Sequence, residues 1–289
     1  MSLSFLMTVF LACSGDKPAA ETPSTPAAET PKAEAAPKNS APKQLPKDVI
    51  SAAKEIALVP SPAEMKKSLE NAGIDQNIST FIPTKNEKIT MNVDNKDQIA
   101  VRTGVVMADL VLTVAANEDK TKDLKAFKKK RLDLLQEGFK KLGAGSDVDQ
   151  TIDELRSSIE TDAINDQDLL MQLDELSGVM VPELEYEAGE WVVPLIQAGS
   201  WLEGSYLVAS AIIAKNNYEK ASDLLKQPKV ADYFLKYVQR EGRDKAPDNV
   251  VQQLETTLLK LKEIASKDAL NQADVEEVKK LTHAVINLL

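Results

Sequence analysis

Residues 97–117, DQIAVRTGVVMADLVLTVAAN, decide the fold of this chain. A helix built from this stretch is apolar on nearly every side, and such a helix belongs in the centre of a helical protein. A second stretch of the same kind, residues 191–214, contains no basic residue. We therefore expect two central helices, at 97–117 and at 185–214, with a kink in the second near Pro194 because proline disrupts helical hydrogen bonding.

Amphipathic stretches with apolar residues three and four apart surround these two segments. One begins at Ser61-Pro62-Ala63-Glu64, a capping box with proline in the first position, and Gly73 ends it. A loop over 74–96 is expected to contain a short strand at 88–93. Further helices are expected at 120–142, 146–160, 165–180 (ending before Pro182), 218–226, 229–240, 247–266 and 271–288. The fold class is all-α: an irregular bundle of about nine or ten helices, mostly antiparallel because their connections are short.

The N-terminal part differs in kind from the rest. Residues 3–12, LSFLMTVFLA, are shorter than the roughly 20 residues that span a bilayer, and they suit the apolar region of a secretory signal. Cys13, the only cysteine, follows, and residues 15–47 then hold seven of the 14 prolines and repeat the motif Ala-Glu-Thr-Pro. Such a segment cannot bury apolar area and predicts an extended tether. We expect a signal peptide at 1–12, a tether at 13–47 and one helical domain at 48–289.

The apolar run followed by Ala12 and Cys13 resembles the lipobox of bacterial lipoproteins, although Phe10 stands where leucine is usual. In that family the cysteine is lipidated, the signal peptide is cut before it and the new N-terminus is acylated. The resemblance implies a membrane anchor at Cys13 carrying fatty acids such as palmitate. It also implies a place in the bacterial cell envelope, facing the periplasm or the outer surface. Because no basic residue precedes Cys13, we expect that translation starts upstream of Met1.

Two further segments, GVVMADL at 104–110 and AGSWLEGSY at 198–206, look like segments of all-helical bacterial envelope lipoproteins of uncharacterised function. This resemblance implies a shared fold. It also groups Asp109, Trp201, Glu203 and Gly204 into one common feature, and it implies no activity.

Three charged residues lie inside otherwise apolar helices, namely Arg102, Asp109 and Glu203. Unpaired buried charge is costly, so these residues are expected to pair with one another or to face a cleft. Arg102 and Asp109 share a helix face, and Glu203 is the expected further partner of Arg102. Neighbouring small residues would let the two central helices approach closely: Gly104, Ala108, Ala198, Gly199 and Gly204. A structural ion pair is the favoured interpretation, and a ligand pocket at these residues is the alternative.

The net charge of −10 is unevenly distributed, because residues 157–214 contain 11 acidic residues and no Lys or Arg. This balance argues against nucleic-acid binding, which needs a basic surface. The acidic stretch is expected to be a solvated face, or a docking surface for a basic protein or a hard cation. Its spacing does not match a calcium-binding loop. The basic run 128–131 is likewise expected to be a solvated face.

Catalytic motifs do not emerge from the sequence. One cysteine and one histidine, His283, exclude the familiar zinc motifs and disfavour a Ser-His-Asp triad. We expect no enzymatic activity, no metal site and no cofactor. The expected function is that of a lipid-anchored binding or scaffolding module. The alternative is a lipoprotein that binds a small molecule or cation at a polar site around Arg102, Asp109 and Glu203, near Trp201.

Overall fold

The computed structural model describes residues 58–75, 77–82, 89–114 and 124–288, except for the side chains of residues 179–183. These residues form ten α-helices, three short 3-10 helices and no strand, so the all-α prediction is confirmed. The α-helices are α2 (Pro62–Ala72), α3 (Lys96–Thr113), α4 (Leu124–Leu142), α5 (Ser146–Glu160), α6 (Asp166–Ala188), α7 (Val192–Lys215), α8 (Ala221–Leu225), α9 (Pro228–Glu241), α10 (Asp248–Ala265) and α11 (Gln272–Ile286). The 3-10 helices are η1 (Ile78–Phe81), η3 (Tyr218–Lys220) and η4 (Gly242–Asp244).

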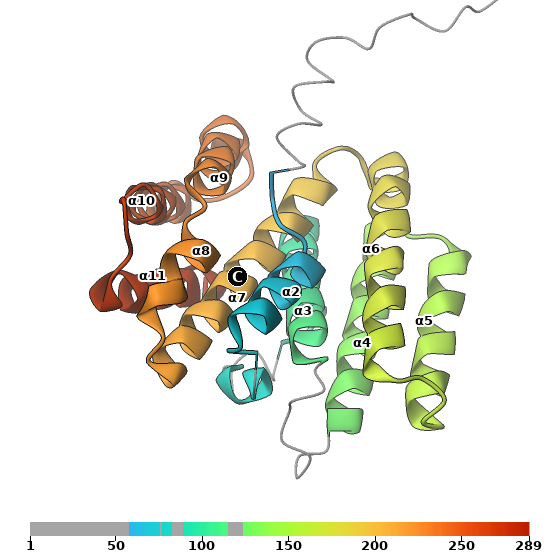
Figure 1. The fold of residues 1–289 in the computed structure, drawn as a ribbon. Coiled ribbons are helices and arrows are strands. Elements are labelled where there is room, and N and C mark those ends of the chain that lie inside the picture. The colour runs from blue at the N-terminus through green and yellow to red at the C-terminus, as the bar shows by residue number, and fades with distance from the viewer. Residues whose placement is uncertain (1–57, 76, 83–88, 115–123, 289) are drawn as a thin grey trace, which may run out of the picture. The chain divides into compact units, whose positions relative to one another are not determined.

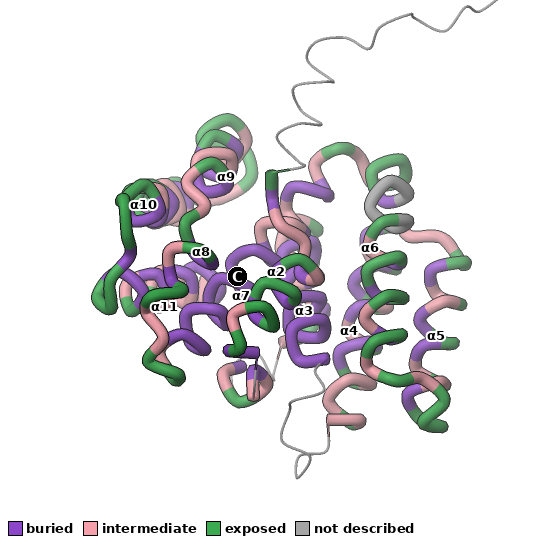
Figure 2. The backbone as a smooth tube through the Cα atoms, in the orientation of Figure 1, coloured by how far each residue is buried: buried purple, intermediate pink, exposed green. Residues whose placement is uncertain are grey.

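Helix α7 is the centre of the molecule. It crosses the middle of Figure 1, with α4, α5 and α6 on one side and α8 to α11 on the other. Figure 2 shows α7 and α3 as the most continuously buried helices, whereas α5 and α6 are exposed along one face. The two apolar stretches of the sequence thus form the two central helices, as predicted. The second one is shorter than the expected 185–214 at its start, because residues 185–188 belong to α6 and α7 begins at Val192.

The contact between α3 and α7 depends on small residues, again as predicted. A Cβ atom on Gly104 would lie 1.9 Å from the Ile196 carbonyl oxygen, and one on Gly199 would lie 2.0 Å from the Val101 carbonyl oxygen. The Ser200 hydroxyl donates a hydrogen bond to the Gly104 carbonyl at 3.0 Å. The two backbones therefore touch, which only glycine permits at these positions. Gly204 has a different role, because it faces Met65 of α2.

Two apolar cores lie on either side of this contact. One joins α3 to α4, α5, α6 and the first turn of α7. The other joins the rest of α7 to α2 and to α8 through α11. Helix α7 contributes to both cores and so links the two halves of the domain.

The helix ends test the predictions made from capping residues. Ser61 and Glu64 form the expected capping box, and Gly73 ends α2 in the left-handed conformation at φ 69°. Pro194 does not kink a helix. It lies in the first turn of α7, where its missing N–H costs nothing. Pro182 does not end α6, which continues past it to Ala188.

The predicted strand at 88–93 is also wrong over its described part, because residues 89–93 form no strand. No second strand lies there to pair with this segment. Side chains satisfy its backbone instead: Arg102 donates to the Thr90 carbonyl and Lys141 to the Met91 carbonyl, both at 2.7 Å. Among the described helices, none is long and apolar enough to cross a membrane.

Candidate functional site

Three charged side chains meet in the interior, each from a different helix. Asp109 of α3 and Glu203 of α7 are 0% exposed, and Arg131 of α4 is 1% exposed. The guanidinium of Arg131 lies 2.9 Å from the Asp109 carboxylate, which also forms a hydrogen bond with Glu203. This buried trio places two carboxyl groups against one cation.

Burial raises the pKa of Asp109 to about 6, although Arg131 and the hydrogen bond with Glu203 act in the opposite direction. Loss of hydration makes the charged carboxylate costly in the interior, so Asp109 keeps its proton to a higher pH than an exposed acid does. Below about pH 6, the proton on Asp109 and the charge of Arg131 together balance most of the charge of the trio. Because none of its members reaches the surface, we assign the trio a structural role at the junction of α3, α4 and α7.

Arg102 takes no part in the ion pair of Asp109. The cation beside Asp109 is Arg131, whereas Arg102 is partly exposed and donates to the Thr90 carbonyl. The two residues do share a helix face, but they lie two turns apart and meet different neighbours. The expected pairing of Arg102 with Asp109 is therefore corrected. Arg131, which the sequence placed on a solvated basic face, is instead fully buried.

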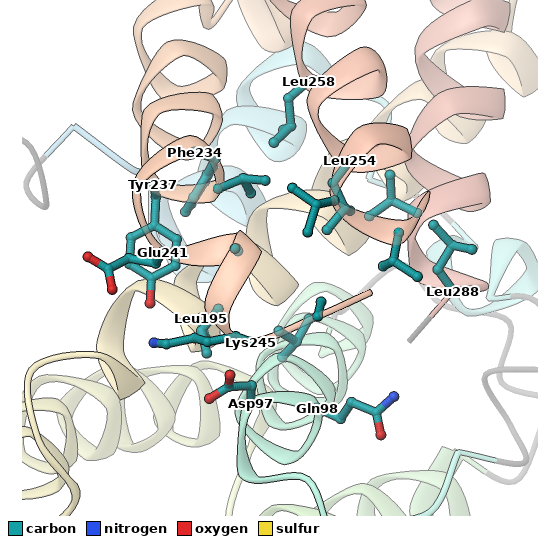
Figure 3. Close-up of a pocket in the computed structure, with 18 of the residues that line it drawn as sticks. Asp97, Gln98, Leu195, Phe234, Tyr237, Glu241, Lys245, Leu254, Leu258 and Leu288 are labelled. Atoms are coloured by element: carbon teal, nitrogen blue, oxygen red, sulfur yellow. The ribbon is translucent and has the colours of Figure 1, made fainter. Parts of the chain in front are cut away.

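Empty space lies elsewhere, on the other side of α7. A cavity of about 390 Å3 opens between the start of α3, the first half of α7, the α9–η4–α10 segment and the end of α11. Figure 3 shows aliphatic and aromatic side chains along most of its wall. Its apolar lining includes Leu195, Ala198, Trp201, Leu202, Phe234, Leu254, Leu258, Val285 and Leu288. Such a wall, with few polar groups, is the usual form of a site for a small organic molecule.

Trp201 is the one predicted site residue that lines this cavity. Its indole N–H donates to the Gln227 side-chain oxygen at 2.7 Å, and its ring centroid lies 5.4 Å from that of Phe234. These contacts fix the orientation of the ring between α7 and α9. Arg102, Asp109 and Glu203 are not part of the lining.

Polar groups gather at one end of the cavity. Asp97 and Gln98 come from the first turn of α3, Glu241 ends α9, and Lys245 directly follows η4 (Figure 3). Tyr237 lies among them and donates to the Trp191 carbonyl at 3.4 Å. Burial, assisted by the charges of Asp97 and Glu241, raises the pKa of Tyr237 to about 12, so its hydroxyl stays protonated.

Comparisons of the chain with protein-family models, curated proteins and solved structures found no match. The residues themselves are therefore the basis for assigning any role to the cavity.

Most of the cavity could not be predicted from the sequence. Its residues from α9 and α10 are ordinary members of amphipathic helices, and only their packing leaves a gap. One signal was present, because aromatic residues make up only 4% of the chain. Phe234 and Tyr237 lie three apart on one face of α9, and with Trp201 they place three scarce rings on one cavity.

The acidic stretch 157–214 is partly neutralised by α4. Lys125 pairs with Asp162 at 2.7 Å, and Lys129 pairs with Glu160 at 2.8 Å. Lys128 pairs in the same way with Asp166, at 2.6 Å. Within the described residues, no group of three or more His, Cys, Asp or Glu residues is placed to hold a metal ion. Docking of a basic protein on this stretch stays a prediction.

Proposed function

We propose that this chain is a lipid-anchored protein of the bacterial cell envelope, without catalytic activity, that binds a small molecule with a large apolar part in the cavity beside α7. The cavity is the single observation that carries the binding role. The anchor is proposed from the sequence alone.

Cavity size supports a ligand of moderate length. A protein cavity of about 150 Å3 is known to hold benzene, and by the same ratio 390 Å3 would take roughly fifteen non-hydrogen atoms. The wall offers aliphatic and aromatic carbon over most of its surface, so transfer of an alkyl or aryl group from water would be favourable. The ligand site proposed here replaces the polar site first expected around Arg102, Asp109 and Glu203.

Binding is proposed in preference to catalysis because of the chemistry of the lining. The described residues around the cavity include no Ser, Thr, Cys or His, and they therefore offer no hydroxyl or thiol nucleophile other than the phenol of Tyr237. The strongly perturbed carboxyl group, Asp109, lies outside the cavity and is fully buried. A substrate would not reach it.

The N-terminal sequence supports delivery and anchoring. The apolar run 3–12, Cys13 and the proline-rich stretch 15–47 follow the order of signal, lipid attachment and spacer found in bacterial lipoproteins. At about 3.1 Å per residue in an extended form, such a spacer would let the domain stand well away from the membrane. The envelope location, facing the periplasm or the outer surface, follows from this anchor.

The binding role is tested with N-phenyl-1-naphthylamine, a neutral apolar probe that becomes fluorescent in apolar sites. We expect saturable binding to the full chain, and a loss of at least about tenfold in affinity when Leu254→Trp fills the cavity. Leu259→Trp is the matched control, because Leu259 lies on the same helix, is 47% exposed and does not line the cavity. Equal binding by both variants would exclude the cavity as the site.

The anchor is tested by mass spectrometry of the mature N-terminus from native membranes. We expect a chain that begins at Cys13 and carries acyl groups. A Cys13→Ser variant should leave the membrane fraction. An intact leader or an unmodified Cys13 would overturn the anchoring proposal without affecting the cavity.

A further inference from the structure

We infer that the ligand of the cavity is a zwitterionic amphiphile, with an aliphatic tail among the leucines and a head group that carries both a cation and an anion. This inference rests on the proposed function. It follows from the way in which polar and apolar groups are divided along the cavity and from the signs of the charges at its polar end.

The cavity has two chemically different ends. Leu254 and Leu258 of α10 lie with Leu288 at the apolar end, where no charged group is drawn near them in Figure 3. Asp97 at the start of α3 and Lys245 just after η4 lie at the other end, near Tyr237. A purely apolar molecule would leave this second end to water, whereas an amphiphile would match both.

The charges at the polar end are of both signs, and two of them form no ion pair with a described residue. Glu241 is neutralised by Arg240, whose guanidinium lies 2.8 Å away. Asp97 makes no ion pair or side-chain hydrogen bond with any described residue, and the same holds for the Lys245 ammonium group. Lys245 lies near the Trp191 and Tyr237 rings and its charge acts on Glu241. The cavity is therefore lined by one carboxylate and one ammonium group that have no ion-pair partner among the described residues.

Both charges lie beside the same aromatic ring. The charge of Asp97 acts on Tyr237, and the Lys245 nitrogen lies 6.0 Å from the centre of that ring and 5.8 Å from the centre of the Trp191 ring. Aromatic faces attract quaternary and primary ammonium groups. Lys245 already occupies this position beside the Tyr237 ring. A ligand cation would thus pair with Asp97, and a ligand anion such as a phosphate would pair with Lys245.

A head group with a charge of one sign would pair with either Asp97 or Lys245 and would be repelled by the other residue. A cationic head would be repelled by Lys245, and an anionic head by Asp97. A neutral sugar head would leave both charges without an ionic partner. The zwitterion is the single class that complements both.

The test compares four amphiphiles with the same dodecyl tail, each below its critical micelle concentration. Their head groups are phosphocholine, trimethylammonium, sulfate and maltoside, and binding to the full chain is followed by fluorescence of its two tryptophans, Trp191 and Trp201. We expect the phosphocholine compound to bind about threefold to tenfold more tightly than each of the others, which is the size of one or two partly exposed ion pairs.

Two variants assign the head group to its partners. Asp97→Asn should weaken binding of the phosphocholine and trimethylammonium compounds but not of the sulfate. Lys245→Gln should weaken binding of the phosphocholine compound and the sulfate but not of trimethylammonium. The matched controls are Asp94→Asn and Arg243→Gln, which remove one exposed charge each beside the site but outside the lining.

The outcomes separate this inference from the function on which it rests. If all four amphiphiles bind equally, the cavity takes an apolar tail and the zwitterion inference is wrong. The same holds if a singly charged or neutral head group is preferred. If none of them binds and N-phenyl-1-naphthylamine also fails to bind, the proposed function itself is overturned.

Discussion

The two faces of α7 are packed in opposite ways. Toward α3 the backbones touch at Gly104 and Gly199, and the nearby Asp109 and Glu203 are enclosed completely. Toward α9 and α10, large side chains hold the helices apart and leave about 390 Å3 unfilled. The buried charges and the space for a ligand therefore lie on different faces of α7. We call the face toward α3 the closed face and the face toward α9 and α10 the open face. Glycines and buried charged residues characterise the closed face, whereas ordinary apolar residues form the open face.

Removal of the buried cation should have the largest effect. Arg131→Met leaves the Asp109–Glu203 pair without the guanidinium that balances it, and breaking a buried ion pair on one side typically costs about 3–5 kcal/mol. Urea unfolding at pH 7 measures this loss. The control is Lys129→Met on the same helix, whose pair with Glu160 is open to solvent and should therefore contribute little to stability. Equal losses of unfolding free energy in the two variants would mean that the buried ion pair of Arg131 stabilises the fold no more than the exposed pair of Lys129.

The protonation of Asp109 predicts a pH dependence confined to the closed face. Its pKa in the folded state is about 6, against 3.8 for an exposed Asp, so the folded chain binds the proton more tightly than the unfolded chain does. The contribution of this residue to stability is therefore highest below pH 4, falls between pH 4 and pH 6, and has dropped by roughly 3 kcal/mol at pH 7.

The difference between the wild type and Asp109→Asn isolates this contribution. Exposed acids with lowered pKa values, such as Glu160 and Glu277, stabilise the fold with the opposite dependence, but their effects cancel in the difference. We expect the variant to gain about 2–3 kcal/mol relative to the wild type between pH 4 and pH 7. A constant difference across this range would show that Asp109 ionises normally.

The close approach of α3 and α7 should tolerate no added atom. Gly104→Ala places a Cβ atom against the Ile196 carbonyl, and the required shift of one helix should cost about 2 kcal/mol. Gly178→Ala in α6 makes the same chemical change where nothing lies within 4 Å. Because alanine favours a helix more than glycine, that variant should gain about 0.5–1 kcal/mol. Thermal or urea unfolding of both variants gives the comparison.

The difference between the two faces also explains what the sequence could and could not predict. The closed face carries local signals, because Gly104, Gly199 and the isolated charges Asp109 and Glu203 are conspicuous in apolar helices. Their convergence was predictable, but the cation was not. Arg131 lies in a run of lysines on a third helix, and periodicity on one helix does not indicate which neighbour will reach a buried carboxylate.

The open face carries almost no local signal. Its cavity exists because α9, α10 and α11 pack against α7 at distances that depend on all four helices together, and no residue spacing encodes such a gap. Helix ends likewise differ in how far local sequence predicts them. The capping box at Ser61 depends on neighbouring residues and was predictable, whereas the continuation of α6 past Pro182 depends on context beyond the local sequence.

The smallest expected effect is the most direct comparison of the two faces, because one methylene group should have opposite signs on each. Val250 borders the cavity, so Val250→Ile fills part of an existing space and should raise stability by about 0.5–1 kcal/mol. Val105 is 1% exposed and its backbone nitrogen lies 3.1 Å from the Cβ position of Gly199, so Val105→Ile should cost about 1 kcal/mol. Unfolding in urea measures both. The filled cavity should also bind N-phenyl-1-naphthylamine less tightly in the first variant and unchanged in the second. A gain in stability with weaker probe binding for Val250→Ile, and a loss in stability with unchanged binding for Val105→Ile, would show that the free space lies beside Val250 and not beside Val105. Equal losses of stability in both variants would show that both valines lie in filled cores.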